Sequence, residues 1–365
     1  MKDRKIFFYI SNLAKGGAER VCINLAEYFH SLGYNVGIIT SYKSENEYYL
    51  NPEIKRILLN DTYYSGNVVY RNIVLMRRLR NVVKTEQPDI LISFMAESNL
   101  RSLVSTIGID LIRIVSVRND PNREYAGILG KITGKIVMPF AEGAIFQTQD
   151  AMNWFPKKLK KKSKVILNPV REEVFDIQRL PETGRIVSIG RLDEQKNQML
   201  LIESFKEVLE TNNNARLYIY GEGKLRDTLT NKINSEGLQD SVFLCGYFKD
   251  IVEVLSKTEI FVLSSNYEGL PNALMEALAA GVPCISTDCP SGGPKALIKN
   301  DVNGILTPVN DKNALTSAMS RLLDSESLRD YISNNAIKYA EEFKTGEINQ
   351  QWKSYIKQLY NLKYK

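Results

Sequence analysis

The stretch SSNYEGLPNALMEALAAGVPCIST, residues 264–287, contains the turn, helix and strand from which the fold can be argued. Glu268 lies in a turn that follows the apolar run EIFVLS (259–264), which is typical of a buried strand. Pro271 is suited to the first position of the next helix, and Glu276 lies on that helix among leucines and alanines. Because such an apolar helix is buried and a buried unpaired carboxylate is costly, we expect both carboxylates to face a ligand. The alternative is an ordinary helix surface.

The same alternation of strand and helix extends through the rest of the chain. In the second half, apolar runs at 185–190, 215–220, 241–246, 259–264, 282–287 and 304–309 alternate with helical segments such as 197–210. In the first half, the runs lie at 5–10, 35–40, 54–59, 89–94, 112–117 and 143–148, with an amphipathic segment at 17–33. Two successive alternations predict an α/β protein with two doubly wound, Rossmann-like domains that face a central cleft.

The segment 160–184 contains two prolines and a lysine block but no long apolar helix, so it is the expected joint. We predict an N-terminal domain over 1–170 and a C-terminal domain over 171–343. The tail, 344–365, is predicted to be a helix that crosses back to the first domain.

Composition excludes several classes of protein. The chain has 365 residues, 44% of them hydrophobic and 25% charged, which fits two globular domains. One histidine and four cysteines without CxxC spacing argue against a zinc site and a Ser-His-Asp hydrolase. No apolar run reaches the ~18 residues that span a bilayer, and the N-terminus does not read as a signal peptide. We therefore expect a cytoplasmic protein with reduced thiols.

The net charge of +6 is unevenly divided. Residues 1–170 contain 25 Lys and Arg against 15 Asp and Glu, a net of +10, and the rest of the chain has a net of −4. The basic residues gather in two blocks, Lys157, Lys158, Lys160, Lys161, Lys162 and Lys164, and Arg71, Arg77, Arg78, Arg80 and Lys84. These blocks are either solvated faces or a surface for anionic lipid. Nucleic acid is not expected, because no nucleic-acid-binding motif accompanies the charge.

Two further loops have the chemistry to bind phosphate. SNLAKGGAER (11–20) places Gly16 and Gly17 between a strand and a helix, where backbone amides suit an anion. GRLDEQKNQ (190–198) places Arg191 after a strand and Lys196 at the start of a helix, a pair that could hold a diphosphate. Each loop could equally be an ordinary turn. With Glu268 and Glu276 for sugar hydroxyls, these loops favour a nucleotide-sugar as the ligand.

Together these segments resemble a known family. GRLDEQKN, EGLPNALMEALAAG, ILNPV at the joint and GGAER near the start are similar to the retaining glycosyltransferases of family 4, which have the GT-B fold. The E-x7-E spacing from Glu268 to Glu276 is the hallmark of that family. The similarity covers essentially the whole chain and points to capsule, O-antigen and N-glycan assembly enzymes.

The resemblance implies a role for each of these residues. Arg191, Lys196 and Glu268 would be catalytic, the two cations neutralising the donor diphosphate and Glu268 contacting the transferred sugar. Glu276 would accept hydrogen bonds from the ribose. The remaining donor-binding residues would be Gly16 and Gly17 at the phosphates, Gly269 and Leu270 at the distal phosphate, and Gly221, Gly223, Cys245, Gly246 and Tyr247 around the base.

The implied activity is retaining transfer of a hexose or N-acetylhexosamine to a hydroxyl of a glycan acceptor. The expected donor is a UDP-sugar, with GDP open, and the expected acceptor is lipid-linked through polyprenyl diphosphate or an oligosaccharide. No metal and no cofactor are expected. The enzyme would associate peripherally with the inner face of the cytoplasmic membrane. A nucleotide-sugar 2-epimerase of the same fold and a non-catalytic nucleotide-sugar-binding subunit are the alternatives.

The sequence departs from some relatives in one respect. Several of them place a histidine near the donor sugar, whereas here the strand 112–117 leads into Arg118 and Asn119. We expect these two residues and Glu97 on the acceptor side. For Glu97 the alternative is a carboxylate that favours the dipole of its own helix.

Overall fold

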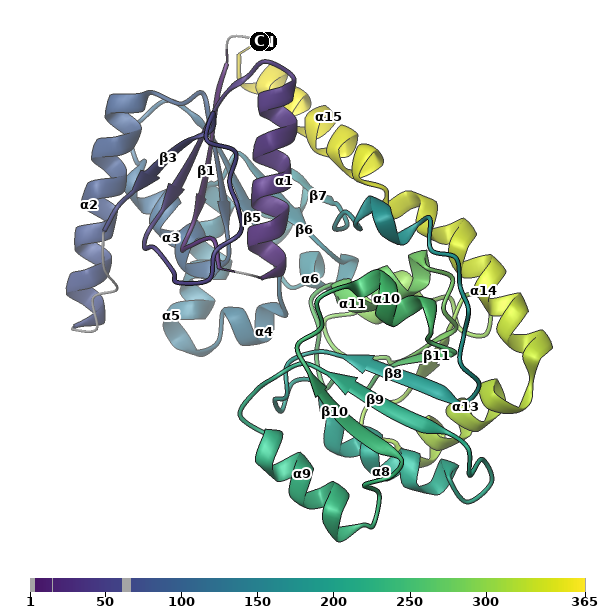
Figure 1. Cartoon of the computed structure of the whole chain (residues 1–365). Helices are drawn as coiled ribbons and strands as arrows, with labels where there is room; N and C mark the ends of the chain where they lie inside the picture. Colours follow the sequence, from purple (N-terminus) through teal and green to yellow (C-terminus); the bar gives the residue numbers. More distant parts are fainter. Residues whose placement is uncertain (1–3, 15, 61–66, 365) are drawn as a thin grey trace. The chain divides into compact units, whose positions relative to one another are not determined.

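The computed structural model describes residues 4–14, 16–60 and 67–364, and Figure 1 shows the chain. It divides into two compact units, Met1–Leu167 with Asn349–Lys365, and Asn168–Ile348. The change of unit thus comes three residues before the expected boundary at 170, and the chain re-enters the first unit at Asn349.

The first unit is built on a seven-stranded parallel sheet of order β3-β2-β1-β4-β5-β6-β7. The register pairs Ile6 of β1 with Val36 on one side and Ile90 on the other. Its strands are β1 Lys5–Ile10, β2 Asn35–Thr40, β3 Lys55–Leu58, β4 Ile90–Phe94, β5 Ile112–Ser116, β6 Gly143–Phe146 and β7 Ser163–Val165. The central strands are buried on both faces, which explains their continuous apolar sequences.

Helices cover both faces of this sheet. They are α1 Gly17–Ser31, α2 Val68–Glu86, α3 Ala96–Ser105, α4 Pro121–Glu124, α5 Gly127–Ile132, the π-helix η1 Thr133–Val137, the 3-10 helix η2 Met138–Phe140, α6 Gln149–Asn153 and α7 Lys157–Lys160. On one face, the Phe8 ring lies 6.4 Å from both Phe29 of α1 and Phe94 of β4. On the other face, α2 packs Leu75, Leu79 and Val83 into the core.

The C-terminal helix α15 (Thr345–Lys363) completes the first unit. Trp352 is fully buried and its ring stacks on Phe94 at 6.2 Å. The Tyr355 hydroxyl accepts a 2.9 Å hydrogen bond from the Ala144 amide and donates to the Ala144 carbonyl at 3.2 Å. Aromatic residues near the end of the chain therefore complete a core that begins at residue 5.

One strand lies where we predicted only a charged joint. β7 pairs with β6 inside the lysine block, with Ser163 opposite Ala144 and Val165 opposite Phe146. Three residues at the edge of a sheet need no apolar run, so the lysines concealed the strand. The expectation that 160–184 is all connection was therefore wrong for its first part.

The second unit has a six-stranded parallel sheet of order β10-β9-β8-β11-β12-β13. Its strands are β8 Arg185–Ile189, β9 Arg216–Tyr220, β10 Val242–Gly246, β11 Ile260–Leu263, β12 Cys284–Thr287 and β13 Ile305–Thr307. Its helices are η3 Glu172–Val174, α8 Gln198–Val208, α9 Arg226–Ser235, α10 Ile251–Ser256, α11 Asn272–Ala279, α12 Gly293–Leu297, α13 Lys312–Asp324, α14 Glu326–Ala340 and η4 Glu341–Phe343. All six strands fall where the sequence predicted them.

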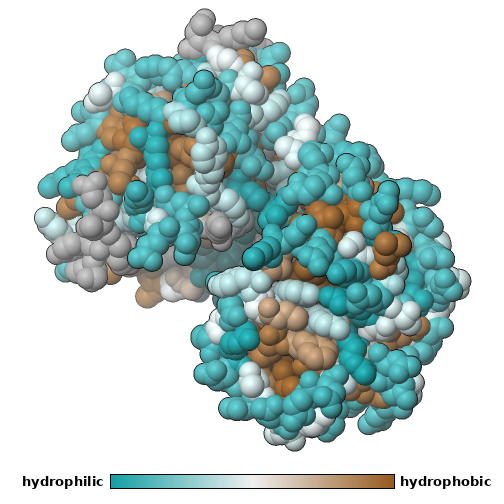
Figure 2. All heavy atoms as spheres, in the orientation of Figure 1, coloured by the Kyte–Doolittle hydropathy of each residue, from teal (hydrophilic) through white to brown (hydrophobic). Residues whose placement is uncertain are grey.

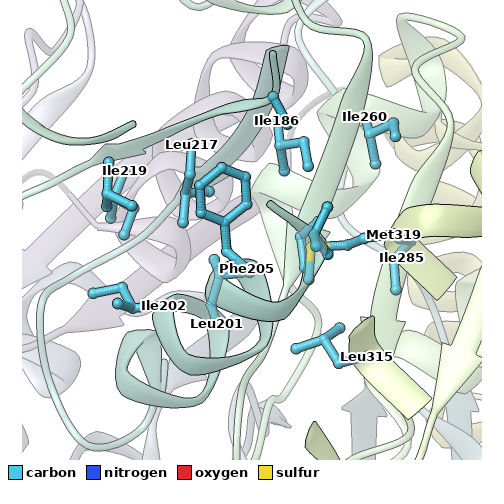
Figure 3. Packing of buried hydrophobic residues seen from close by; sticks show 14 of the residues in the cluster. Ile186, Leu201, Ile202, Phe205, Leu217, Ile219, Ile260, Ile285, Leu315 and Met319 are labelled. Atoms are coloured by element: carbon cyan, nitrogen blue, oxygen red, sulfur yellow. The ribbon is translucent and has the colours of Figure 1, made fainter. Parts of the chain in front are cut away.

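The core of the second unit lies between its sheet and the helices α8 and α13 (Figure 3). Phe205 and Leu201 point from α8 toward Ile186 and Leu217 of the sheet, and Met319 approaches from α13. This packing fixes the central strands and hence the loops that leave their carboxyl ends.

Both sheets reverse their strand order at a central point, between β1 and β4 and between β8 and β11. In doubly wound sheets, ligands bind outside the carboxyl ends of the strands at such a switch point. The loops that follow β8 and β11 are therefore the first place to search for a site.

Candidate functional site

A buried ion pair joins the two loops at the switch point of the second unit. Lys196, from the loop after β8, places Nζ 2.5 Å from Oε1 of Glu268, in the turn after β11. Both side chains are largely buried, at 16% and 6% exposed. Ser265 donates to the same Oε1 at 2.7 Å, and Gln195 Nε2 lies 3.4 Å from Oε2. Hydrogen bonds on both oxygens hold Glu268 as an ionised carboxylate in a fixed orientation.

Arg191 lies in the same loop but is far more accessible. Its side chain is 72% exposed, with Nη2 3.4 Å from Asp193 and 3.2 Å from Gln195. Exposed ion pairs of this kind contribute little energy, so an incoming anion can compete for the guanidinium. The site thus combines a buried cation that is already paired with an exposed cation that is available to a diphosphate.

The turn before α11 presents backbone amides. The helix begins at Asn272 and Pro271 is its N-cap, one position earlier than we predicted. Within the part of the chain that the structure describes, the amides of Gly269 and Leu270 donate no hydrogen bond. Unpaired amides at the start of a helix are suited to bind a phosphate oxygen.

A second loop, Pro290–Gly293, holds this turn in place. The Glu268 amide donates to the Pro290 carbonyl at 2.6 Å, and the Ser291 amide returns a bond to the Glu268 carbonyl at 3.0 Å. A Cβ on Gly293 would lie 1.9 Å from the Gly269 carbonyl oxygen, so only glycine fits there. The sequence analysis missed this loop, although its Gly-Gly pair was a usable signal.

Glu276 lies on α11 with its side chain only 7% exposed. Its Oε1 lies 3.4 Å from Nε of Arg171, which belongs to the segment that enters the second unit. Close by, Asn168 donates a 2.8 Å hydrogen bond to the Asn272 side chain at the start of α11. The motif at the joint therefore packs along α11 and supplies Arg171, a cation that we did not identify from the sequence.

The glycines predicted around the base have a clear structural purpose. A Cβ on Gly221 would lie 2.0 Å from the Gly190 carbonyl oxygen, and one on Gly223 would lie 2.4 Å from that of Leu192. Both glycines therefore allow close packing against the loop that carries Arg191. Gly246 has a φ of +69°, and Tyr247 beyond it is 82% exposed, as Cys245 is on its other side. Their contact with a base stays a prediction.

In the first unit, Gly16 is the N-cap of α1 and Gly17 is its first residue. A Cβ on Gly16 would lie 2.3 Å from Oε2 of Glu19, so this carboxylate lies close to the start of the helix. Burial raises the pKa of Glu19. A phosphate at this position would meet Glu19 as well as the amides, so phosphate contact by the two glycines stays a prediction.

The three residues expected on the acceptor side have different surroundings. Glu97 lies in the first turn of α3 and pairs with Arg101 one turn later on the same helix. Arg118 is buried, with its guanidinium 5.2 Å from the Phe94 ring centroid and 5.6 Å from that of Trp352. Burial lowers the pKa of Arg118. The Asn119 side chain accepts a 2.9 Å hydrogen bond from the next amide, and no observation here assigns it a ligand.

A buried carboxylate that we did not predict lies beside these residues. Glu124 accepts a 2.6 Å hydrogen bond from the Ala96 amide at the start of α3. Burial raises its pKa to about 7. The only sequence signal was its position two residues before the end of a polar turn, which is too weak to identify a buried acid.

No group of three or more histidine, cysteine, aspartate or glutamate side chains capable of holding a metal ion occurs among the residues with described positions. The cationic groups near Glu268 are instead Lys196 and Arg191.

Two doubly wound parallel sheets, with cations and a buried carboxylate at the switch point of the second, define the class as GT-B glycosyltransferases. The model for group 1 glycosyl transferases matches residues 170–339, and that for glycosyltransferase family 4 matches residues 15–173. The chain belongs to glycosyltransferase family 4, which confirms the resemblance found in the sequence.

Relatives and solved structures agree with this family. A Campylobacter jejuni α-1,4-N-acetyl-D-galactosaminyltransferase, whose acceptor is an undecaprenol-linked saccharide, is 28% identical over 98% of this chain and 99% of its own. An uncharacterised glycosyltransferase of Methanocaldococcus jannaschii is 29% identical over 87% and 92%. The structure of Thermosynechococcus elongatus sucrose-phosphate synthase aligns with a TM-score of 0.84, 16% identity and coverage of 98% and 100%. Anabaena HepE in complex with UDP aligns with a TM-score of 0.80, 16% identity and coverage of 97% and 100%. These two structures show the fold, and the predicted GT-B architecture is confirmed.

Proposed function

We propose that this glycosyltransferase moves an N-acetylhexosamine or a hexose from a UDP-sugar to a hydroxyl of a polyprenyl-diphosphate-linked glycan, with retention at the anomeric carbon. Two Campylobacter jejuni relatives, matched over 98% and 97% of this chain, act on undecaprenol-linked saccharides and transfer N-acetylgalactosamine. The observation that carries the proposal is the Lys196–Glu268 pair beside the exposed Arg191.

Donor binding would divide between the residues of the second unit. Arg191 and Lys196 neutralise the diphosphate, and the amides of Gly269 and Leu270 bind the distal phosphate. Glu276, held by Arg171, accepts hydrogen bonds from the ribose hydroxyls. Glu268 receives hydrogen bonds from the hydroxyls of the transferred sugar, because Lys196 and Ser265 occupy Oε1 and leave capacity on Oε2.

The reaction breaks the bond between the anomeric carbon and the β-phosphate oxygen. Negative charge grows on that phosphate as the bond breaks, so cations fixed beside it stabilise the transition state more than the bound donor. The acceptor hydroxyl forms the new bond on the same face. We assign no covalent role to Glu268, because a carboxylate held by an ammonium and a hydroxyl is a poor nucleophile.

We further propose that these cations take the place of a divalent metal and that the enzyme works at a membrane surface. Of the helices that the structure describes, none has the length and apolar character needed to cross a bilayer. The net +10 charge of residues 1–170 supports attraction to anionic lipid. Among the basic residues of α2, Arg78 and Arg80 donate to backbone carbonyls within the unit, so the lysines of residues 157–164 are the better candidates.

The test is acceptor-dependent release of UDP from a panel of UDP-sugars and GDP-sugars, with vesicles that carry a polyprenyl-diphosphate-linked saccharide. We expect release with one UDP-sugar, in EDTA, and appearance of the sugar on the lipid with its donor configuration retained. A 2-epimerase would convert the donor without an acceptor, and a non-catalytic subunit would bind the donor without releasing UDP. Either result would overturn the proposal, and Glu268→Gln serves as the inactive control.

A further inference from the structure

The segment Gly127–Phe140 has apolar residues on both its inner and its outer face. Inward, Met138 is buried and Val137 packs beside it against Tyr125 and its neighbours in the core. Outward, a set of apolar side chains spaced mainly by four residues is exposed, and we call it the α5–η2 face: Ile128 (80%), Leu129 (80%), Ile132 (42%), Ile136 (60%) and Phe140 (62%). A helix that is apolar on all sides needs a partner on its outer face.

Figure 2 shows where this surface lies. Hydrophobic residues, drawn in brown, gather at the lower edge of the first unit, over the position that α5 has in Figure 1. Scattered single apolar residues on a surface need no explanation, but five that are consecutive along one helical segment form a patch.

Lysines surround the α5–η2 face. Lys131 and Lys135 lie on the same helical segment and are exposed. Lys158 of α7 lies 5.1 Å from the Phe140 ring centroid, which brings the lysine block predicted from the sequence to the edge of the patch. Partial burial and the nearby Lys160 lower the pKa of Lys135, as expected where ammonium groups crowd together.

Few acids balance this charge. Residues 121–164 contain nine Lys and Arg against three Asp and Glu, a net of +6. Glu124 is committed to the start of α3, and Glu142 is paired with Arg113. In the described ranges, Lys131, Lys135 and Lys158 form no salt bridge. The lysines are therefore available to an external anionic surface.

An apolar centre with a basic rim is the pattern of a segment that lies in a membrane interface. Its apolar side chains enter the boundary between head groups and acyl chains, while lysine stems extend along the surface to reach anionic head groups. A soluble protein partner would match the apolar patch but would need a matching acidic rim, whereas an anionic lipid surface supplies both properties at once.

We infer that the α5–η2 face is the membrane-docking surface of this enzyme, which inserts Ile128, Leu129 and Phe140 into an anionic bilayer. The inference rests on the proposed lipid-linked acceptor and specifies how the enzyme reaches it. The chain runs from Asn119, expected on the acceptor side, directly into this face. Docking here would hold the acceptor-side strand ends at the height of the lipid head groups.

The experiment measures binding of the full chain to vesicles of phosphatidylglycerol and phosphatidylcholine, and to phosphatidylcholine alone. We expect the partition constant of Ile128→Ser/Leu129→Ser to fall by about tenfold or more, because each apolar side chain kept out of lipid is worth roughly a factor of ten. The matched control is Leu180→Ser/Leu362→Ser, which removes two other exposed leucines, 79% and 70% accessible, and should bind like the unchanged protein.

Two further measurements separate insertion from simple charge attraction. Binding should fall with salt but persist in part above ~0.5 M, where the Debye length is only a few Å. An Ile128→Trp variant should be quenched by lipids brominated on their acyl chains, whereas Leu362→Trp should not. Equal loss of binding in the control pair, complete loss at high salt, or absence of quenching would overturn the inference.

Failure of docking and failure of the proposed transferase give different results. Turnover on a short water-soluble acceptor should be unchanged in Ile128→Ser/Leu129→Ser and reduced only on vesicle-borne acceptor. Turnover without any vesicle binding would refute the docking surface alone, and vesicle binding without turnover on any acceptor would refute the proposed function alone. A change from dimer to monomer in the double variant, with vesicle binding unaltered, would assign the face to self-association and refute docking.

Discussion

Replacement of Glu276 by alanine should weaken binding of UDP through the ribose and through nothing else. The carboxylate is 7% exposed, and the Arg171 guanidinium, 3.4 Å from Oε1, keeps it ionised. Charged hydrogen bonds of this kind contribute about 1.5–3 kcal/mol, which corresponds to a rise in Kd of roughly 10–150-fold. Glu276→Gln keeps the shape and one acceptor oxygen, so it should lose less affinity than Glu276→Ala.

The measurement is calorimetric titration of each variant with UDP and with 2′,3′-dideoxy-UDP. If the carboxylate binds the ribose hydroxyls, the unchanged enzyme loses affinity for the dideoxy compound, and Glu276→Ala loses nothing further. The two changes should therefore be strongly non-additive. Circular dichroism and the melting temperature check that the variant is folded.

A particular result would refute this reasoning. If Glu276→Ala weakens UDP and dideoxy-UDP by the same factor, the carboxylate does not contact the ribose. Its pair with Arg171 would then only stabilise the packing of the joint against α11. Arg171→Met offers a second check, because loss of the cation should raise the Kd for UDP while leaving the discrimination between the two nucleotides intact.

Three other predictions follow from the geometry. Arg191→Met should reduce kcat tenfold or more and leave the melting temperature unchanged, since the side chain is 72% exposed, and turnover of the unchanged enzyme should be insensitive to EDTA; normal turnover in the variant would remove Arg191 from the transition state. Gly293→Ala should lower the melting temperature because its Cβ would lie 1.9 Å from a carbonyl oxygen, whereas Gly346→Ala, with nothing within 4 Å, should not; equal melting temperatures would contradict the packing of that loop. The pKa of Glu124 is raised from 4.5 to about 7, so the folded protein holds a proton that the unfolded chain has lost, and stability from this group falls as pH rises between these values. Glu124→Gln should therefore match the unchanged protein near pH 4, exceed its stability by about 2–3 kcal/mol at pH 8, and show a smaller pH slope, while a difference that is constant with pH would refute the burial argument.

The sequence alone determined the architecture, for a local physical reason. Strands buried on both faces of a parallel sheet must be apolar along their whole length, and the helices between them must have apolar stripes, so both leave periodic patterns. All six strands of the second unit could therefore be located. The pair Glu268 and Glu276 was also evident, because two carboxylates around an apolar helix conflict with burial unless each has a partner.

The tertiary structure decided which groups partner these carboxylates. Lys196 is 72 residues from Glu268 in the chain, and Arg171 belongs to a joint whose direction no local pattern specifies. The same limit applied to Glu124, which is an ordinary surface acid by sequence and becomes a buried acid only where α4 meets α3.

Exposure, too, was decided only by the three-dimensional fold. The apolar residues of α2 and those of the α5–η2 face have similar helical spacing, yet Leu75 and Leu79 lie in the core while Ile128 and Leu129 face outward. Periodicity shows that one side of a helix is apolar, but it does not show what covers that side. The sequence therefore determined where helices and strands form, and the packing of elements distant in the chain determined which apolar face remained uncovered and which charges met.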